Sequence, residues 1–114
     1  MSAVNEYKDF YAICNHEPVG ESRIRVGGTV SFARQGCAAE LQTYEGDTGI
    51  VPEPTTLHLT LALKPSEIGG AVIEDVPLDE WSENDPRVEY AEVKFFVSGT
   101  DDAPPPPQKV EHVQ

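Results

Sequence analysis

The sequence is short of basic residues. Eight Lys and Arg stand against 20 Asp and Glu, which gives a formal net charge of −12. Nucleic-acid phosphates and anionic membrane surfaces both attract clustered cations, so we expect no nucleic acid and no membrane as partners. A large charge of one sign favours solubility and mutual repulsion, and we therefore expect a monomer or a weak dimer.

Long hydrophobic runs are also missing. No segment approaches the roughly 20 apolar residues of a membrane-spanning helix. The first ten residues lack the apolar centre of a secretory signal, and the expected location is therefore cytoplasmic. Cysteines stay reduced there, so the two in the chain, Cys14 and Cys37, are predicted to be buried free thiols.

Helix signals are scarce as well. Ten prolines and nine glycines are spread along 114 residues, and no window has clean three- and four-residue apolar spacing. Apolar and polar residues alternate instead, which predicts one all-β domain over residues 1–98, a two-sheet antiparallel sandwich. About six or seven strands are expected, which suggests an immunoglobulin-like architecture. The Cys–Trp–Cys order of antibody domains is absent, because Trp81 follows both cysteines.

Two strands have the clearest core faces. Residues 55–64 place four leucines on one side. Residues 22–33 contain Gly27 and Gly28, and a two-residue hairpin there would divide the apolar residues between two faces. We therefore predict one continuous strand in which glycine marks a bend or a close backbone approach, with a three-residue turn as the alternative. The predicted core residues of the two strands are Ile24, Val26, Val30, Phe32, Leu57, Leu59, Leu61 and Leu63.

Further strands are expected over residues 10–14, 37–44, 71–78 and 87–98, with a short edge piece at 50–51 and an acidic turn at 82–86. Residues 99–114 contain four consecutive prolines and little apolar surface, so we predict a flexible tail. The run Pro104–Pro107 fits the Pro-x-x-Pro form of ligands for proline-binding domains, but a stiff spacer is the simpler interpretation.

Four residues have side chains that suit zinc or copper: Cys14, His16, Cys37 and His58. Their spacing matches no known ligand pattern, and Cys37 and His58 are predicted to face opposite sides of their strands. The simpler interpretation is two buried thiols and two unrelated histidines. A weaker candidate is calcium at the acidic residues Asp79, Glu80, Glu83 and Asp85, although they lack the spacing and the glycine of a calcium loop.

No nucleophile elbow, phosphate loop or metalloprotease motif is present, so no catalytic residue and no cofactor are predicted. Trp81 is a candidate anchor for a partner, although packing at one end of the core is the preferred interpretation. Enzymatic activity stays open but is not favoured. The leading hypothesis is a non-enzymatic module that binds a protein partner. The alternative is a small domain that binds a ligand or a metal ion (calcium, zinc or copper), with hydrolytic chemistry at loop ends as a further option.

Overall fold

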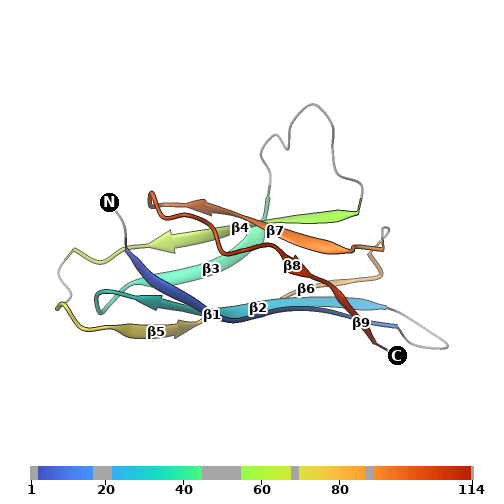
Figure 1. Ribbon diagram of the computed structural model, residues 1–114, viewed down its shortest axis with the longest axis horizontal. Helices are drawn as coiled ribbons and strands as arrows, with labels where there is room; N and C mark the ends of the chain where they lie inside the picture. The colour runs from blue at the N-terminus through green and yellow to red at the C-terminus, as the bar shows by residue number, and fades with distance from the viewer. Residues whose placement is uncertain (1–2, 17–21, 45–54, 68–69, 87–88, 114) are drawn as a thin grey trace.

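The computed structural model describes residues 3–16, 22–44, 55–67, 70–86 and 89–113. These residues form strands and no helix, in two layers that pack face to face (Figure 1), and the all-β sandwich prediction is confirmed. It follows that the described part of the chain contains no helix long and apolar enough to cross a membrane. The immunoglobulin-like architecture stays a prediction. The strands are β1 (Val4–Asn15), β2 (Arg23–Phe32), β3 (Ala38–Thr43), β4 (Thr56–Lys64), β5 (Glu74–Pro77), β6 (Trp81–Asn84), β7 (Glu92–Ser98), β8 (Gln108–Lys109) and β9 (Glu111–Val113).

Each layer is one sheet. The β1 sheet has the order β5-β2-β1-β9, and β6 also pairs with β2; the β4 sheet has the order β3-β4-β7-β8. β5 and β6 lie end to end along β2, because β5 pairs with residues 29–32 and β6 with residues 23–26. Two pairs, β1 with β9 and β4 with β7, are parallel and differ from the antiparallel arrangement that we predicted. β4 and β7 can be parallel because the chain between them crosses to the β1 sheet and returns.

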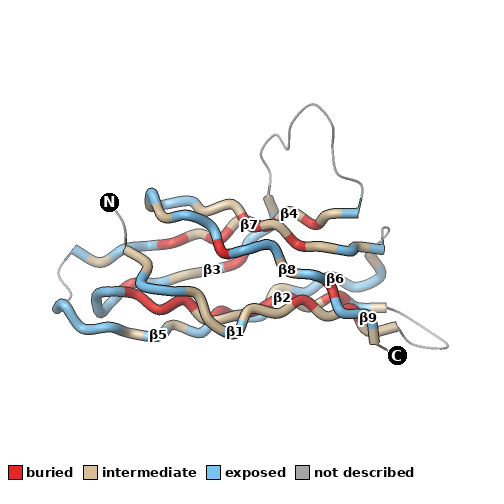
Figure 2. The backbone as a smooth tube through the Cα atoms, viewed as in Figure 1, coloured by how far each residue is buried: buried red, intermediate tan, exposed pale blue. Residues whose placement is uncertain are grey.

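The core lies between the facing sides of the two sheets, where Figure 2 shows the buried positions. The leucine ladder of β4 faces inward, and Leu59 and Leu61 have no exposed surface. On β2 the predicted apolar face is fully buried, which confirms the second core strand. The buried apolar residues are Ala12, Cys14, Ile24, Val26, Val30, Phe32, Cys37, Leu41, Leu57, Leu59, Leu61, Leu63, Leu78, Val93, Phe95 and Val110.

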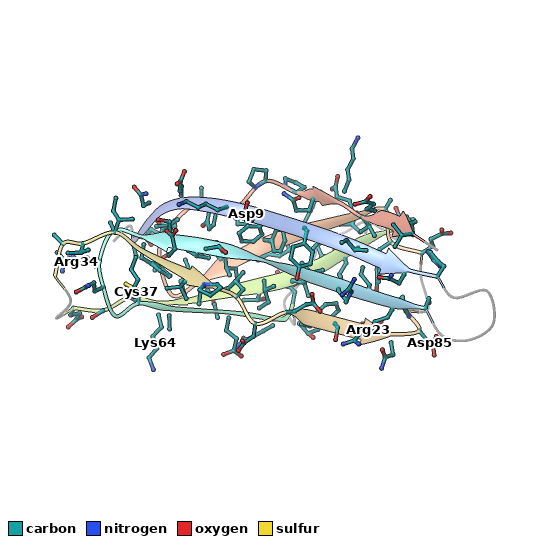
Figure 3. All side chains as sticks on the ribbon, turned by 90° about the horizontal axis from the view of Figure 1, so that it is seen from below. Asp9, Arg23, Arg34, Cys37, Lys64 and Asp85 are labelled. Carbon is teal, nitrogen blue, oxygen red and sulfur yellow. The ribbon has the colours of Figure 1, made fainter. Side chains whose placement is uncertain are left out.

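β2 continues through its two glycines without a turn, so the continuous-strand prediction is confirmed. A Cβ on Gly27 would lie 2.5 Å from the hydroxyl of Tyr11, and one on Gly28 would lie 2.5 Å from Cδ1 of Phe10. The glycines therefore leave room for two aromatic side chains of β1 to lie against β2. The pairing of β1 with β2 shifts register at this point, beside Asp9, whose φ is 54° (Figure 3).

Several strand bounds differ from the prediction. β6 occupies most of the predicted acidic turn at 82–86, because its backbone pairs with one half of β2. β5 and β7 are shorter than predicted, and β1 is longer than the predicted segment at 10–14. The predicted edge piece at 50–51 lies outside the described residues.

Residues 99–113, named here the C-terminal strap, follow the free edge of β1. At the start of β1, the Asp102 carboxylate accepts hydrogen bonds from the backbone N–H groups of Ala3 (2.9 Å) and Val4 (3.1 Å). The Tyr7 hydroxyl donates to the carbonyl of Ala103 at 2.6 Å. At the other end of β1, β9 forms a parallel pair with residues 13–15.

The strap also joins the two sheets, because β8 pairs with β7 of the β4 sheet and β9 pairs with β1 (Figure 1). Pro105 and Val110 are buried along its path, and the Val110 N–H donates to the carbonyl of Ala91 at 2.9 Å. These contacts correct the prediction of a flexible tail for residues 99–113. Composition alone does not reveal that a free strand edge is present to bind the segment.

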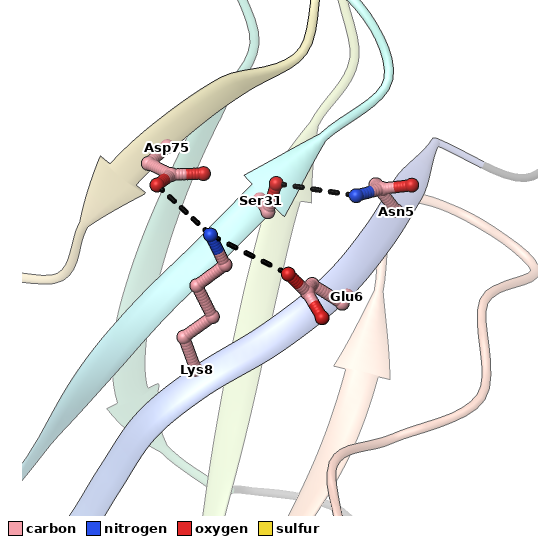
Figure 4. A network of polar contacts seen from close by, with 5 residues as sticks. All are labelled: Asn5, Glu6, Lys8, Ser31 and Asp75. Carbon is pink, nitrogen blue, oxygen red and sulfur yellow. Dashed lines mark hydrogen bonds and ion pairs between the residues drawn. The ribbon is translucent and has the colours of Figure 1, made fainter.

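A polar network joins β1, β2 and β5 on the outer side of the β1 sheet (Figure 4). The Lys8 ammonium lies 3.1 Å from an Asp75 carboxylate oxygen and 3.4 Å from one of Glu6. Ser31 is fully buried beneath this network and accepts a hydrogen bond from the Asn5 amide at 3.5 Å. Hydrogen bonding from Ser31, and then from Lys8, lowers the pKa of Asp75, so this carboxylate stays charged and holds β5 to the sheet.

Substitution of Gly28 by alanine should destabilise the sandwich. The new Cβ would overlap Cγ and Cδ1 of the Phe10 ring. This ring cannot easily move away, because it packs edge-on against the ring of Phe95, with 5.4 Å between the centroids. We expect Gly28→Ala to lower the free energy of unfolding by about 1–3 kcal/mol, measured by urea denaturation. The control is Gly70→Ala, whose Cβ would meet only a Gln35 oxygen at 3.9 Å. Equal stability of the two variants would contradict the close-approach explanation.

The contact between Tyr7 and the strap should weaken at high pH. Burial, and then the Asp102 carboxylate, raises the pKa of Tyr7 from 10.0 to about 12. Since the folded pKa lies above the unfolded value, this stabilisation is present below pH 10 and is lost as the pH rises towards 12. The free energy of unfolding should therefore fall more steeply between pH 9.5 and pH 11.5 in the wild type than in Tyr7→Phe. The measurement is a series of urea denaturation curves at pH intervals of about 0.5. Equal slopes would show that Tyr7 contributes nothing to this loss.

Candidate metal centre

Three side chains with soft or borderline donor atoms meet where β9 joins β1. Cys14 lies on β1, His16 lies one residue beyond the end of β1, and His112 lies on β9. Their donor atoms are all within 4.8 Å of one another. The parallel register places Cys14 directly opposite His112, and the His16 N–H donates to the carbonyl of Val113 at 2.7 Å. Pairing of β9 with β1 therefore builds this cluster.

The two histidines are in direct contact. Nε2 of His16 lies 2.8 Å from Nδ1 of His112, and the rings are stacked with centroids 5.0 Å apart. Nε2 of His112 lies 2.9 Å from the backbone carbonyl oxygen of Tyr90. Because a carbonyl can only accept, this Nε2 carries a hydrogen, and in the neutral ring Nδ1 of His112 then has a lone pair towards the cluster. Metal-ligating histidines are usually held in the same way, by a hydrogen bond from the nitrogen that faces away from the metal.

The Cys14 thiol is the buried member of the cluster, with 4% of the residue exposed. Burial, and then the charge of Glu89, raises the pKa of Cys14. The thiol is therefore protonated near neutral pH, and a metal ion that binds it must displace the proton. The Glu89 carboxylate lies 3.9 Å from Nδ1 of His112, on the exposed side of the cluster.

This arrangement suits a small transition-metal ion. In a tetrahedral zinc site with ordinary bond lengths, nitrogen and sulfur donors lie about 3.3–3.6 Å apart. The two imidazole nitrogens, at 2.8 Å, need to separate slightly to reach this spacing. The sulfur lies within 4.8 Å of both of them. Thiolate and imidazole together select zinc or copper rather than magnesium or calcium.

The structure leaves the other two residues of the predicted zinc or copper set outside this cluster. The Sγ of Cys37 accepts a hydrogen bond from the N–H of Ser66 at 3.4 Å. His58 lies on the outer face of the β4 sheet, with ring centroids 6.2 Å from Tyr44 and 5.6 Å from Phe96. Both cysteines are buried and free, as predicted.

The acidic residues predicted as a weak calcium site have separate roles. Glu80 accepts a hydrogen bond from the Tyr11 hydroxyl at 2.5 Å, and Asp85 accepts one from the N–H of Ser22 at 3.0 Å. Glu83 lies within β6, and Asp79 is exposed before that strand. In the described ranges, these carboxylates do not meet as a group of three.

Trp81, the candidate partner anchor, is the first residue of β6 and pairs with Val26. Its partly buried ring packs against the hydrophobic core. This placement agrees with the preferred interpretation, in which the tryptophan closes part of the core.

His112 is the site residue that sequence reasoning misses, because the composition of its segment predicts a flexible tail. One signal was available. After the proline run, Val110 and Val113 stand on either side of Glu111 and His112, which is a short stretch of strand-forming composition that also contains one of the three histidines.

Comparison of the chain with known protein families, with curated proteins and with solved structures finds no match in any of the three.

Proposed function

We propose that this protein binds one transition-metal ion of the zinc and copper class through Cys14, His16 and His112. The observation that carries the proposal is the meeting of a thiol and two imidazoles within 4.8 Å, although 96 residues separate His16 from His112. The bond from His112 to the Tyr90 carbonyl supports it further, because it directs the free nitrogen of His112 towards the other two donors.

The competing interpretation is a hydrogen-bonded histidine pair that only stabilises the fold. Such a pair leaves the nearby Cys14 thiol without a role, whereas a metal site uses this thiol as a third ligand. The three donors of the cluster also match the three protein ligands, with one further position, of many zinc sites. Calcium is disfavoured because it prefers hard oxygen ligands, and the cluster supplies sulfur and nitrogen.

The test is retention of metal by purified protein. After treatment with a chelator, the chain is incubated with zinc, separated from free metal by gel filtration and analysed by mass spectrometry. We expect about one zinc ion per wild-type chain, with Cys14→Ser and His112→Gln each weakening the affinity at least about tenfold through loss of one ligand. The same experiment with copper compares the two ions.

Matched controls come from the other cysteine and another histidine. Cys37→Ser and His58→Gln make the same chemical changes outside the cluster and should retain zinc as the wild type does. Retention that falls equally in Cys37→Ser and Cys14→Ser, or a wild type that keeps no zinc and no copper, would refute the proposal.

A second candidate function is binding of a protein partner. Val72 and Ile73, just before β5, are 52% and 61% exposed and adjacent. Exposed apolar side chains that lie together favour contact with another protein. The double variant Val72→Ser/Ile73→Ser should lose a protein that the wild type captures from native lysate. If the wild type and the double variant capture the same proteins, Val72 and Ile73 do not form a binding surface for a partner.

A further inference from the structure

We infer that metal binding at Cys14, His16 and His112 controls the attachment of the end of the C-terminal strap, residues 110–113. With the ion bound, these residues are held to β1; without it, they detach more often and expose the β1 edge. This inference rests on the proposed metal binding and extends it to a metal-responsive change in the fold.

The first reason is the origin of the ligands. Cys14 and His16 belong to β1 and the residue beyond it, whereas His112 belongs to the strap. A metal ion that binds all three therefore joins the end of β1 to the end of the strap, which meet there through the β1–β9 pairing and the contact between the histidines. Figure 1 shows β9 beside the end of β1, at the end of the path from the β4 sheet to the β1 sheet.

The second reason is that the attachment without metal is short. The parallel pair of β1 with β9 covers three residues on each strand. The His16 N–H adds one hydrogen bond to Val113, and Val110 adds one buried side chain. Single hydrogen bonds to the carbonyls of Ala91 and Tyr90 hold Val110 and His112 from the other side. Short terminal pairings of this kind open at much lower free energy than the centre of a sheet does.

The third reason is linkage. An ion that binds the attached state and not the detached state reduces the detached population by the factor 1 + [metal]/Kd. The detached state keeps only Cys14 and His16 and should bind far more weakly. At a free metal concentration of about 100 times Kd, detachment should therefore become about 100-fold rarer.

Detachment has a defined structural consequence. The edge of β1 at residues 13–15 loses its partner strand, and the place of Val110 in the core opens. An unpaired strand edge beside an apolar opening can accept an extended peptide segment, because such an edge supplies backbone hydrogen bonds and a side-chain pocket. Metal binding closes that edge.

The test is digestion of the folded, full-length chain from its C-terminus with a serine carboxypeptidase, which does not depend on metal. Mass spectrometry follows the removal of residues 110–113 with and without zinc, under conditions in which wild-type retention of zinc is measured in parallel. We expect zinc to slow this removal at least about tenfold in the wild type and to have no effect in His112→Gln. A synthetic peptide of residues 105–114 controls for any effect of zinc on the protease.

Amide hydrogen exchange provides a second measurement that needs no variant. The His16 N–H, which donates to Val113, should exchange at least about tenfold more slowly with zinc, whereas the Ala33 N–H, which donates to Ala3 at the far end of β1, should not change. Retained zinc with unchanged digestion and exchange would overturn the inference and leave the proposed metal binding intact. If the wild type retains only copper, copper replaces zinc in both measurements. A wild type that retains neither zinc nor copper would overturn both the inference and the proposed metal binding.

Discussion

Backbone hydrogen bonding along β1 is the constraint on which the rest of the structure depends. β1 is twelve residues long and pairs on one side with β2 over most of its length. Its other edge would leave N–H and C=O groups without partners, at a cost that folded proteins avoid. The C-terminal strap meets this need at both ends of β1, through Asp102 near the start and β9 near the end. The joining of the two sheets and the position of His112 both follow from this.

Charge and donor chemistry have separate effects in this molecule. The net charge of −12 attracts cations in general, yet the carboxylates of the described residues are dispersed or bonded to neighbouring groups. Glu80 accepts from Tyr11, and Asp75 is paired with Lys8. The donors that converge are instead a thiol and two imidazoles. Selectivity among metal ions is therefore expected to come from donor type, and the acidic surface adds only a general attraction.

The sequence predicts the core well and the site only in part. Alternation correctly assigns the inward residues of β2 and β4, because a strand with one buried face must repeat every two residues. The packing of Phe10 and Tyr11 against Gly27 and Gly28 is harder to predict from the sequence. The glycines indicate a close approach, but they do not identify the side chains that approach.

Long-range pairing explains the other differences. Residues 82–84 belong to the predicted acidic turn, but they form part of β6 because they pair with residues 23–25 of β2, whose other edge pairs with β1. In the same way, the sequence predicts both Cys14 and His16 as zinc or copper ligands, and the two residues are close in the chain. His112 joins them only through the β1–β9 register. Local composition carries no information about that register, because it depends on which strand edges the rest of the fold leaves free.

The position of His112 also determines when the cluster can exist during synthesis. A ribosome makes Cys14 and His16 early, and His112 is the 96th residue that it adds after His16. By then strands β1 to β8 have been translated. The complete set of three donors is therefore available only to a chain that already contains most of the sandwich, and chains that lack His112 offer at most Cys14 and His16. The proposed metal binding would in this way distinguish chains that contain the strap from shorter ones.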